Sequence, residues 1–146
     1  MSEAHAVLGF AVLATNLLAG AWGGVAWVRS EPSVTFWYLL RAAQAVVVAQ
    51  VLLGLLLLAG GRRAPDSLHF LYGVAPLVVA LVSEAMRVGA AHRELAEVAD
   101  VEALERRERA VLARRVVRRE MGIMSVGALL IVTLALRAIG SGGGLL

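Results

Sequence analysis

The sequence predicts an all-α fold: a four-helix transmembrane bundle with a cytoplasmic helical extension between its third and fourth helices. Hydrophobic residues make up 60% of the chain, whereas a soluble domain is about 45–50% apolar. They are concentrated in four runs, each long enough for the roughly 20 residues that a helix needs to cross a hydrocarbon core. Helix is required there because an open strand would leave backbone hydrogen-bonding groups unpaired in lipid. We expect one membrane domain over residues 1–146.

The first two hydrophobic runs predict helices over about 5–28 and 34–59. Glu31, Pro32 and Ser33 lie between them, and this composition is typical of a turn. Gly60 and Gly61 follow the second run, where glycine commonly ends a helix. These breaks give both helices defined ends.

The third and fourth runs predict helices over about 67–88 and 121–139. The segment between them, 89–120, is rich in Ala, Glu, Arg and Leu, and no Gly or Pro follows Gly89 within it, so we expect helix throughout. The simplest arrangement continues the third and fourth helices beyond the membrane as an antiparallel hairpin. Asp100 is a candidate cap for the returning helix, and Glu105 is spaced to pair with Arg109.

The arginines predict the topology, because cytoplasmic loops carry an excess of positive charge. Arg29 and Arg41 flank the first loop, and nine more arginines lie between Arg87 and Arg119, all on one side of the membrane. The other side receives Arg62, Arg63 and Arg137. We therefore expect a multi-pass protein of a bacterial plasma membrane, with both termini outside. The lipid bilayer is a predicted partner, and nucleic acid is not.

Two histidines mark the outer ends of the first and third helices. His5 precedes Gly9 by about one helical turn, and His69 precedes Gly73 by the same spacing. Further small residues continue the face of each histidine, and such faces allow close helix approach and leave room for a flat ligand. Because both histidines lie on one membrane face, the pattern favours a haem b between the first and third helices.

Arg62 and Arg63 lie in the loop before the third helix, where they are placed to pair with haem propionates. Two other interpretations fit the pair of histidines. They are interfacial residues of a ligand-free bundle, or they bind zinc or copper with Glu3 and Asp66 as the nearest carboxylates in the sequence. His92 lies about 35 Å further along the third helix, at 1.5 Å per residue, and is expected to be solvated.

The order of these motifs resembles one half of the haem A synthase family and, more loosely, the four-helix b561-type membrane cytochromes. The chain has His5 and Gly9, then Gln50 and Gly54 at the same spacing, then a Gly- and Pro-containing loop over 60–65, then His69. The resemblance covers about residues 3–80. It implies that His5 and His69 are the two axial ligands of one haem b, which makes them the metal ligands, with Gln50 and Gly54 beside them.

The neighbours of the first histidine differ from those of the family. Haem A synthases typically carry a glutamate three residues before this histidine and an arginine directly after it. Here Glu3 stands two residues before His5, and Ala6 follows. The resemblance therefore implies haem binding and does not extend to the oxidase chemistry of the family.

The leading prediction is a small membrane b-type cytochrome that transfers electrons or handles haem, beside a quinone or a respiratory complex. Imidazoles on both haem faces leave no open position for oxygen, which favours an electron-transfer or haem-binding protein over an enzyme. The alternative is a non-redox structural or assembly subunit of a larger membrane complex, which docks through 89–120. A small transporter is a third hypothesis, indicated by Pro76 and Glu84.

Three further patterns leave two interpretations each. Gly20 and Gly24 are spaced for helix dimerisation and indicate a homo-oligomer, although this spacing is common in apolar helices. Glu84 is a functional candidate because it lies within a membrane helix, or it simply pairs with Arg87 or snorkels to the membrane surface. The segment 89–120 binds a cytoplasmic partner or anionic lipid, or it is a solvated hairpin that joins two spans.

Overall fold

The computed structural model describes residues 3–63 and 67–141. The regular structure in these ranges is helical throughout: α1 (Glu3–Arg29), α2 (Val34–Ala59), α3 (Ser67–Ala96) and α4 (Arg106–Ser141). Each helix contains a stretch that is long and hydrophobic enough to cross a membrane. The predicted all-α fold with four helices is therefore confirmed over the described residues, and the four predicted spans fall within α1 to α4.

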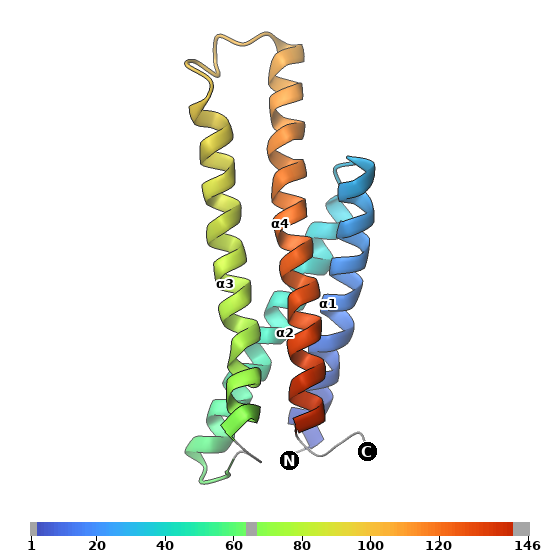
Figure 1. Cartoon of the computed structure of the whole chain (residues 1–146), viewed down its shortest axis with the longest axis vertical. Helices are drawn as coiled ribbons and strands as arrows, with labels where there is room; N and C mark the ends of the chain where they lie inside the picture. Colours follow the sequence, from blue (N-terminus) through green and yellow to red (C-terminus); the bar gives the residue numbers. More distant parts are fainter. Residues whose placement is uncertain (1–2, 64–66, 142–146) are drawn as a thin grey trace.

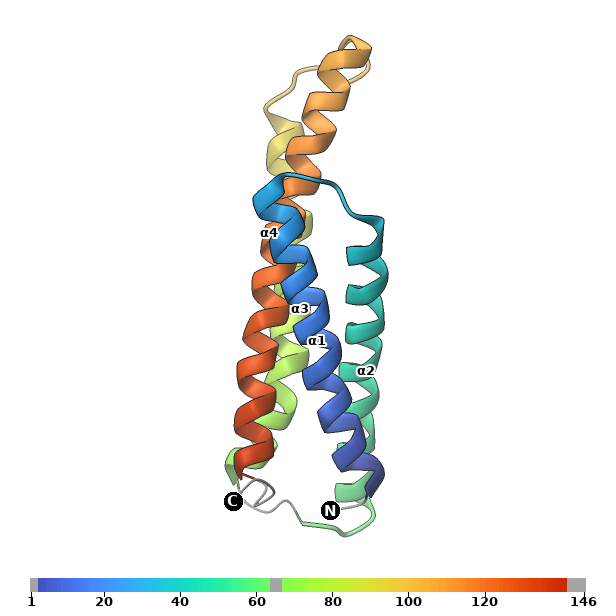
Figure 2. The same cartoon turned by 90° about the vertical axis from the view of Figure 1, so that its right-hand side faces the viewer.

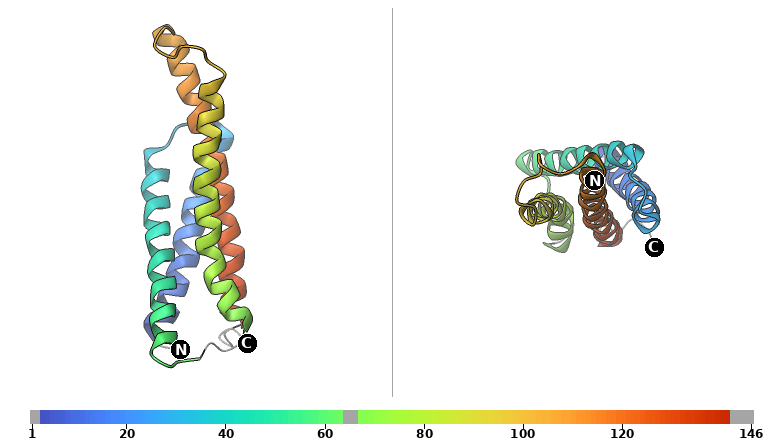
Figure 3. Two further views of the ribbon diagram at one scale, coloured as in Figure 1. Left: turned by 90° about the vertical axis from the view of Figure 1, so that its left-hand side faces the viewer. Right: turned by 90° about the horizontal axis from the view of Figure 1, so that it is seen from above.

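Three of the helices form a layer, and the fourth lies across it. α4 is the middle of the layer, with α3 on one side and α1 on the other, and α2 crosses one face (Figure 3). α2 packs chiefly on α1 and makes few contacts with α3. The bundle is therefore tightly closed along α3–α4 and α1–α4 and more open between α2 and α3.

The two ends of the bundle differ in length and charge. The paired α3 and α4 helices project well beyond the α1–α2 loop (Figures 1 and 2). We call this the arginine-rich end, because it carries Arg29, Arg41 and the arginines of 87–119. The opposite end holds the first turns of α1 and α3 and the last turn of α4, and we call it the histidine end.

The core consists of two hydrophobic clusters along the length of the bundle. Towards the arginine-rich end, Phe36 and Leu40 of α2 pack with Met121 and Met124 of α4 and with a small residue of α1. In the other half, a cluster of four buried residues joins α1, α2 and α4: Val12, Val47, Ile131 and Ala135. Many large hydrophobic side chains face outwards instead, which suits helices that are surrounded by lipid.

Small residues allow α1 and α4 to approach closely. A β-carbon on Gly20 would lie 2.8 Å from the Leu129 side chain, so only glycine fits there without a shift. Nothing lies within 4 Å of the corresponding position on Gly24. One half of the predicted dimerisation motif is therefore used inside the bundle, and Gly24 alone is left for contact with a second copy.

The prediction of helix throughout 89–120 is wrong for residues 97–105. α3 ends at Ala96 and α4 begins at Arg106, and the segment between them is a turn without regular structure. An antiparallel pair requires the chain to reverse, and the packing of α3 on α4 overrides the helical propensity of these residues.

The polar residues of this turn also have partners that differ from those predicted. Asp100 accepts from the backbone N–H groups of Glu102 and Ala103, at 2.9 and 3.2 Å, so it stabilises the turn and does not cap α4. Glu108 instead accepts from the Glu105 backbone N–H at 3.1 Å, as in a capping box. Arg109 donates to backbone carbonyls of the turn and does not pair with the Glu105 side chain.

A buried ion pair holds the projecting parts of α3 and α4 together. Only 3% of the Glu94 side chain is exposed, and its carboxylate lies 2.8 Å from Arg119 and 3.7 Å from Arg115. His92, two residues earlier, is exposed, as predicted. The projection is thus a packed helical hairpin with its own polar contacts.

Candidate functional site

His5 and His69 lie together at the histidine end. Each is in the first turn of its helix, α1 and α3, and their ring centroids are 6.1 Å apart with the ring planes at 59°. A metal ion held in line between two imidazole nitrogens at about 2.0–2.1 Å would keep the ring centroids about 6 Å apart. Each ring is free to rotate about its own metal–nitrogen bond, so the angle between the planes is compatible with this arrangement.

The last turn of α4 orients His69. Its Nδ1 lies 3.2 Å from the backbone carbonyl oxygen of Ala138. A carbonyl only accepts hydrogen bonds, so Nδ1 must carry the proton and donate, which leaves the lone pair on Nε2. Metal-binding histidines commonly donate their second ring N–H to a backbone carbonyl or a carboxylate, and this contact fixes both tautomer and ring orientation.

Gln50 of α2 contacts the other histidine. The Gln50 amide nitrogen, Nε2, lies 3.4 Å from His5 Nε2. An amide nitrogen only donates, so the His5 nitrogen accepts and carries no proton in this arrangement. The distance is long for a hydrogen bond, and the contact is correspondingly weak.

Three glycines surround the pair and have different roles. A β-carbon on Gly54 would lie 3.3 Å from His5 Cε1, and one on Gly9 would lie 3.4 Å from Gln50 Nε2. These two glycines let α1 and α2 come close. Nothing lies within 4 Å of the corresponding position on Gly73, which faces open space.

Two cavities meet at the histidines, with volumes of about 120 and 210 Å³. Five residues line both of them: His5, Gln50, His69, Gly73 and Ala138. The first cavity extends towards the end of α2, and the second extends deeper, past Gly9 and Pro76. A single water needs only about 10–15 Å³, so the histidines stand beside space for a larger ligand.

Arg62 and Arg63 line the first cavity. Their position follows from the way α2 ends. Gly61 has a φ of +82°, its N–H donates to Leu58 O, and the Arg62 N–H donates to Leu57 O. This is a Schellman motif, which requires the left-handed conformation that glycine adopts most easily. The predicted cationic residues and the predicted histidines therefore share one cavity.

The described residues contain no group of three or more His, Asp or Glu side chains placed to hold a metal ion. Glu3 is thus not a third ligand beside the histidines, while Asp66 lies outside the described residues. Protein zinc sites normally use at least three protein ligands, whereas a six-coordinate haem iron takes two axial ligands. The two histidines match the number of protein ligands of a six-coordinate haem iron, and the described residues add no third ligand for a zinc site.

Some residues of the site were not predicted. Ala138 acts through its backbone carbonyl, so its identity gives no signal in the sequence. Val47 also lines the second cavity, one helical turn before Gln50, and their i, i+3 spacing on α2 was a usable signal. Tyr72 lines the same cavity, and the Arg137 guanidinium lies 5.9 Å from its ring centroid. That contact joins α3 to α4, and helical spacing alone does not predict it.

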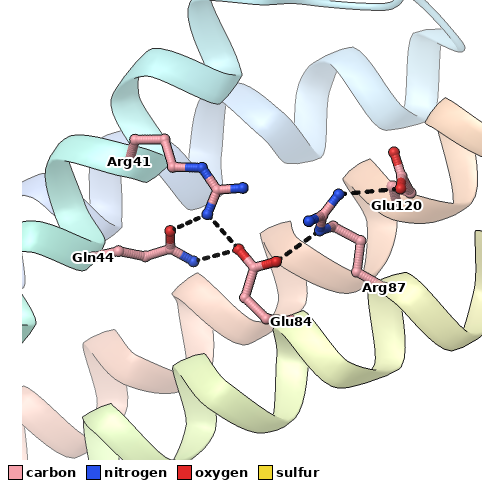
Figure 4. Close-up of polar contacts among 5 residues, drawn as sticks. All are labelled: Arg41, Gln44, Glu84, Arg87 and Glu120. Carbon is pink, nitrogen blue, oxygen red and sulfur yellow. Dashed lines mark hydrogen bonds and ion pairs between the residues drawn. The ribbon is translucent and has the colours of Figure 1, made fainter.

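Glu84 belongs to a second polar cluster near the arginine-rich end, and we call it the Glu84 cluster (Figure 4). One oxygen of its carboxylate accepts from Arg41 at 2.5 Å and from Gln44 at 2.9 Å, and the other accepts from Arg87 at 2.8 Å. Arg87 also donates to Glu120 at 3.2 Å. The predicted pair with Arg87 is therefore present, within a network that joins α2, α3 and α4.

Comparison of the chain with protein-family models, with curated proteins and with solved structures finds no match. The resemblance to haem A synthases and b561-type cytochromes therefore stays a prediction, based on the motifs of residues 3–80. The geometry of the histidine end is what supports a ligand there.

Proposed function

We propose that this protein is a small membrane cytochrome of the b type, which binds one haem through His5 and His69 and transfers electrons or handles haem. The observation that carries the proposal is the pair of imidazoles 6.1 Å apart, at the meeting point of two cavities. This spacing suits two ligands of one metal, and the cavities offer room for a flat hydrophobic group.

Each residue of the site has a definite role in this proposal. His5 and His69 would hold the iron, and the Ala138 carbonyl keeps His69 in the tautomer with its proton on Nδ1. Arg62 and Arg63 pair with the haem carboxylates at the end of α2. Gly73 leaves the space between α1 and α3 open. The linings are otherwise mostly hydrophobic, which suits the porphyrin.

Haem supplies one-electron redox chemistry when it is bound. With His5 and His69 both holding the iron, no position would be open for oxygen or a substrate. Electron transfer or haem delivery therefore fits this site better than catalysis. A quinone or a respiratory complex is the kind of partner that would exchange electrons with such a protein.

We also propose that the protein lies in a bacterial plasma membrane with the arginine-rich end in the cytoplasm and both termini outside. The support is the uneven arginine distribution, because membrane proteins retain positive loops on the cytoplasmic side. The haem site then lies near the outer surface. Cysteine labelling from outside the cell tests the orientation, since the sequence contains no native cysteine.

A spectrum of the purified protein tests the haem proposal. Protein from haem-supplied cells should show a Soret band and a reduced-minus-oxidised difference spectrum of the b type. His5→Ala and His69→Ala should each lose these bands. His92→Ala is the matched control, because this histidine is exposed on the projection. A wild-type protein without a Soret band, or bands that survive both substitutions, would refute the proposal.

The alternative function is a non-redox assembly subunit that docks through 89–120. It is favoured by an exposed row on α4: within the described residues, Arg107, Arg114 and Arg118 have no ion pair or hydrogen bond. They lie on one helical face, at spacings of seven and four residues. Co-purification of a partner that is lost on Arg107→Glu with Arg114→Glu, and kept on His5→Ala with His69→Ala, would support this alternative.

A further inference from the structure

Gln50 is a polar side chain from α2 that lines both cavities beside the histidines. Its amide nitrogen contacts His5, but its amide oxygen, Oε1, is buried and has no hydrogen-bond partner among the described residues. A buried acceptor that lacks a donor destabilises the protein. This oxygen therefore marks a place where a hydrogen-bond donor is expected.

The histidine next to it changes its hydrogen-bonding needs when it binds a metal. A metal-bound imidazole uses one nitrogen for the metal and carries a proton on the other, and that N–H normally donates to a carbonyl or a carboxylate. For His69 the acceptor is the Ala138 carbonyl oxygen. For His5, the Gln50 side chain is in contact with the ring.

We propose that Gln50 is the positioning residue of His5: when the site is loaded, its amide oxygen accepts the ring N–H of His5 that is not bound to iron. This inference depends on the proposed haem site and adds a role for one residue of it. The two axial histidines would then have equivalent support, from a backbone carbonyl on α4 for His69 and from a side-chain carbonyl on α2 for His5.

Glutamine suits this position because it offers both a donor and an acceptor. Rotation about the last side-chain bond of glutamine has a broad, roughly two-fold energy profile. The amide nitrogen and oxygen therefore exchange places at low energetic cost. Without a ligand, the Gln50 amide nitrogen donates to His5 Nε2. After loading, the same side chain accepts from a protonated nitrogen. A carboxylate offers only acceptors, and a hydrophobic side chain offers neither.

The packing around Gln50 limits where the amide can go. Gly9 of α1 lies against its Nε2, and Gly54, one turn further along α2, lies against the His5 ring. The His5 ring therefore rests on Gln50 and Gly54, which are four residues apart on one face of α2. This contact gives a physical reason for the Gln50 and Gly54 spacing that the sequence shows.

The experiment compares three variants with the wild type by haem titration and redox potentiometry. Gln50→Met keeps the length of the side chain but removes both amide groups, so haem affinity should fall about 10–100-fold, as for other supporting residues of metal ligands. The midpoint potential should rise, because His5 loses a partner that makes it more basic. Gln50→Glu keeps an acceptor, so it should retain affinity and shift the potential downwards.

Gln44→Met is the matched control, because this second glutamine of α2 belongs to the Glu84 cluster. It should leave affinity and potential unchanged. If Gln50→Met matches the wild type in both measurements while His5→Ala loses haem, the role of Gln50 is wrong and the haem site stands. If the wild type binds no haem, the proposed function itself fails. Should Gln50→Met not fold, an upward potential shift in Gln50→Glu would contradict the inference.

Discussion

The bundle contains two polar clusters. They differ in whether the hydrogen-bonding groups of the cluster pair with one another. In the Glu84 cluster, both carboxylate oxygens of Glu84 have cationic partners, and Arg87 bridges to a second carboxylate (Figure 4). At the histidine end, the Gln50 oxygen has no partner among the described residues, and two cavities adjoin the rings. Charges in a low-dielectric site are stable only when they are paired, so the first cluster is complete as it stands, while the second has room for a ligand.

The two clusters also lie at opposite ends of the contact between α2 and α3. α2 makes few contacts with α3, and the Glu84 cluster ties α2 to α3 near the arginine-rich end. Arg87 strengthens this region further, since its guanidinium lies 5.7 Å from the Trp37 ring centroid of α2. At the histidine end, by contrast, the first cavity lies between α2 and α3. We therefore expect a structural role for Glu84 and a binding role for the histidine end.

The largest effect is expected from the removal of an axial ligand. His69→Ala should lower haem affinity by more than about 100-fold, beyond the loss typical of a supporting residue. Glu84→Gln should leave haem affinity within about two-fold, because its cluster lies near the other end of the bundle and Gln can keep part of the network. Titration of haem into both purified variants measures the difference. A similar loss in the two variants would show that the clusters are not separate.

The next effect concerns stability. Arg87→Ala removes a partner from both Glu84 and Glu120, each of which is largely buried. We expect a loss of about 2 kcal/mol in the free energy of unfolding, since hydrogen bonds to charged groups contribute about 1.5–3 kcal/mol. Unfolding of the detergent-solubilised protein, followed by circular dichroism, measures it. Arg107→Ala, on the exposed face of α4, is the control and should change stability by less than about 0.5 kcal/mol.

A smaller effect is expected from filling the cavities. Gly73→Leu should reduce haem affinity about 10-fold, because the new side chain occupies space that lines both cavities. It should not destabilise the haem-free protein, since leucine is a better helix former than glycine and no atom lies within 4 Å of the added β-carbon. Gly24→Leu is the matched control, as its β-carbon position is equally open. Equal haem affinity in both variants would mean that the cavities are not the binding space.

The smallest effect is expected from the cationic residues of the first cavity. Arg62→Gln and Arg63→Gln should each weaken haem binding about two- to five-fold, because exposed ion pairs contribute about 0.2–1 kcal/mol. The loss should shrink at high salt, where exposed charges are screened. Titrations at low and high ionic strength check this. A loss that does not depend on salt would argue against pairing with haem carboxylates.

The positions of the four helices, and the location of both histidines at one end of the bundle, were predictable from the sequence. The hydrophobic runs define the spans, and an even number of crossings puts the ends of the first and third helices on one face. The reversal near Asp100 was predicted with the antiparallel hairpin, but the irregular segment 97–105 was not, because its composition favours helix. The contacts of His69 with Ala138 and of Arg41 with Glu84 depend on how helices distant in sequence are rotated, which hydrophobic spacing does not specify.

Electron paramagnetic resonance of the oxidised, haem-loaded protein tests the central claim most directly, because it reports the axial ligands of the iron. We predict one low-spin species with two imidazole ligands, at one haem per chain, which becomes high-spin or disappears in His5→Ala and in His69→Ala. A high-spin signal in the wild type, or a low-spin signal that survives both substitutions, would contradict the account.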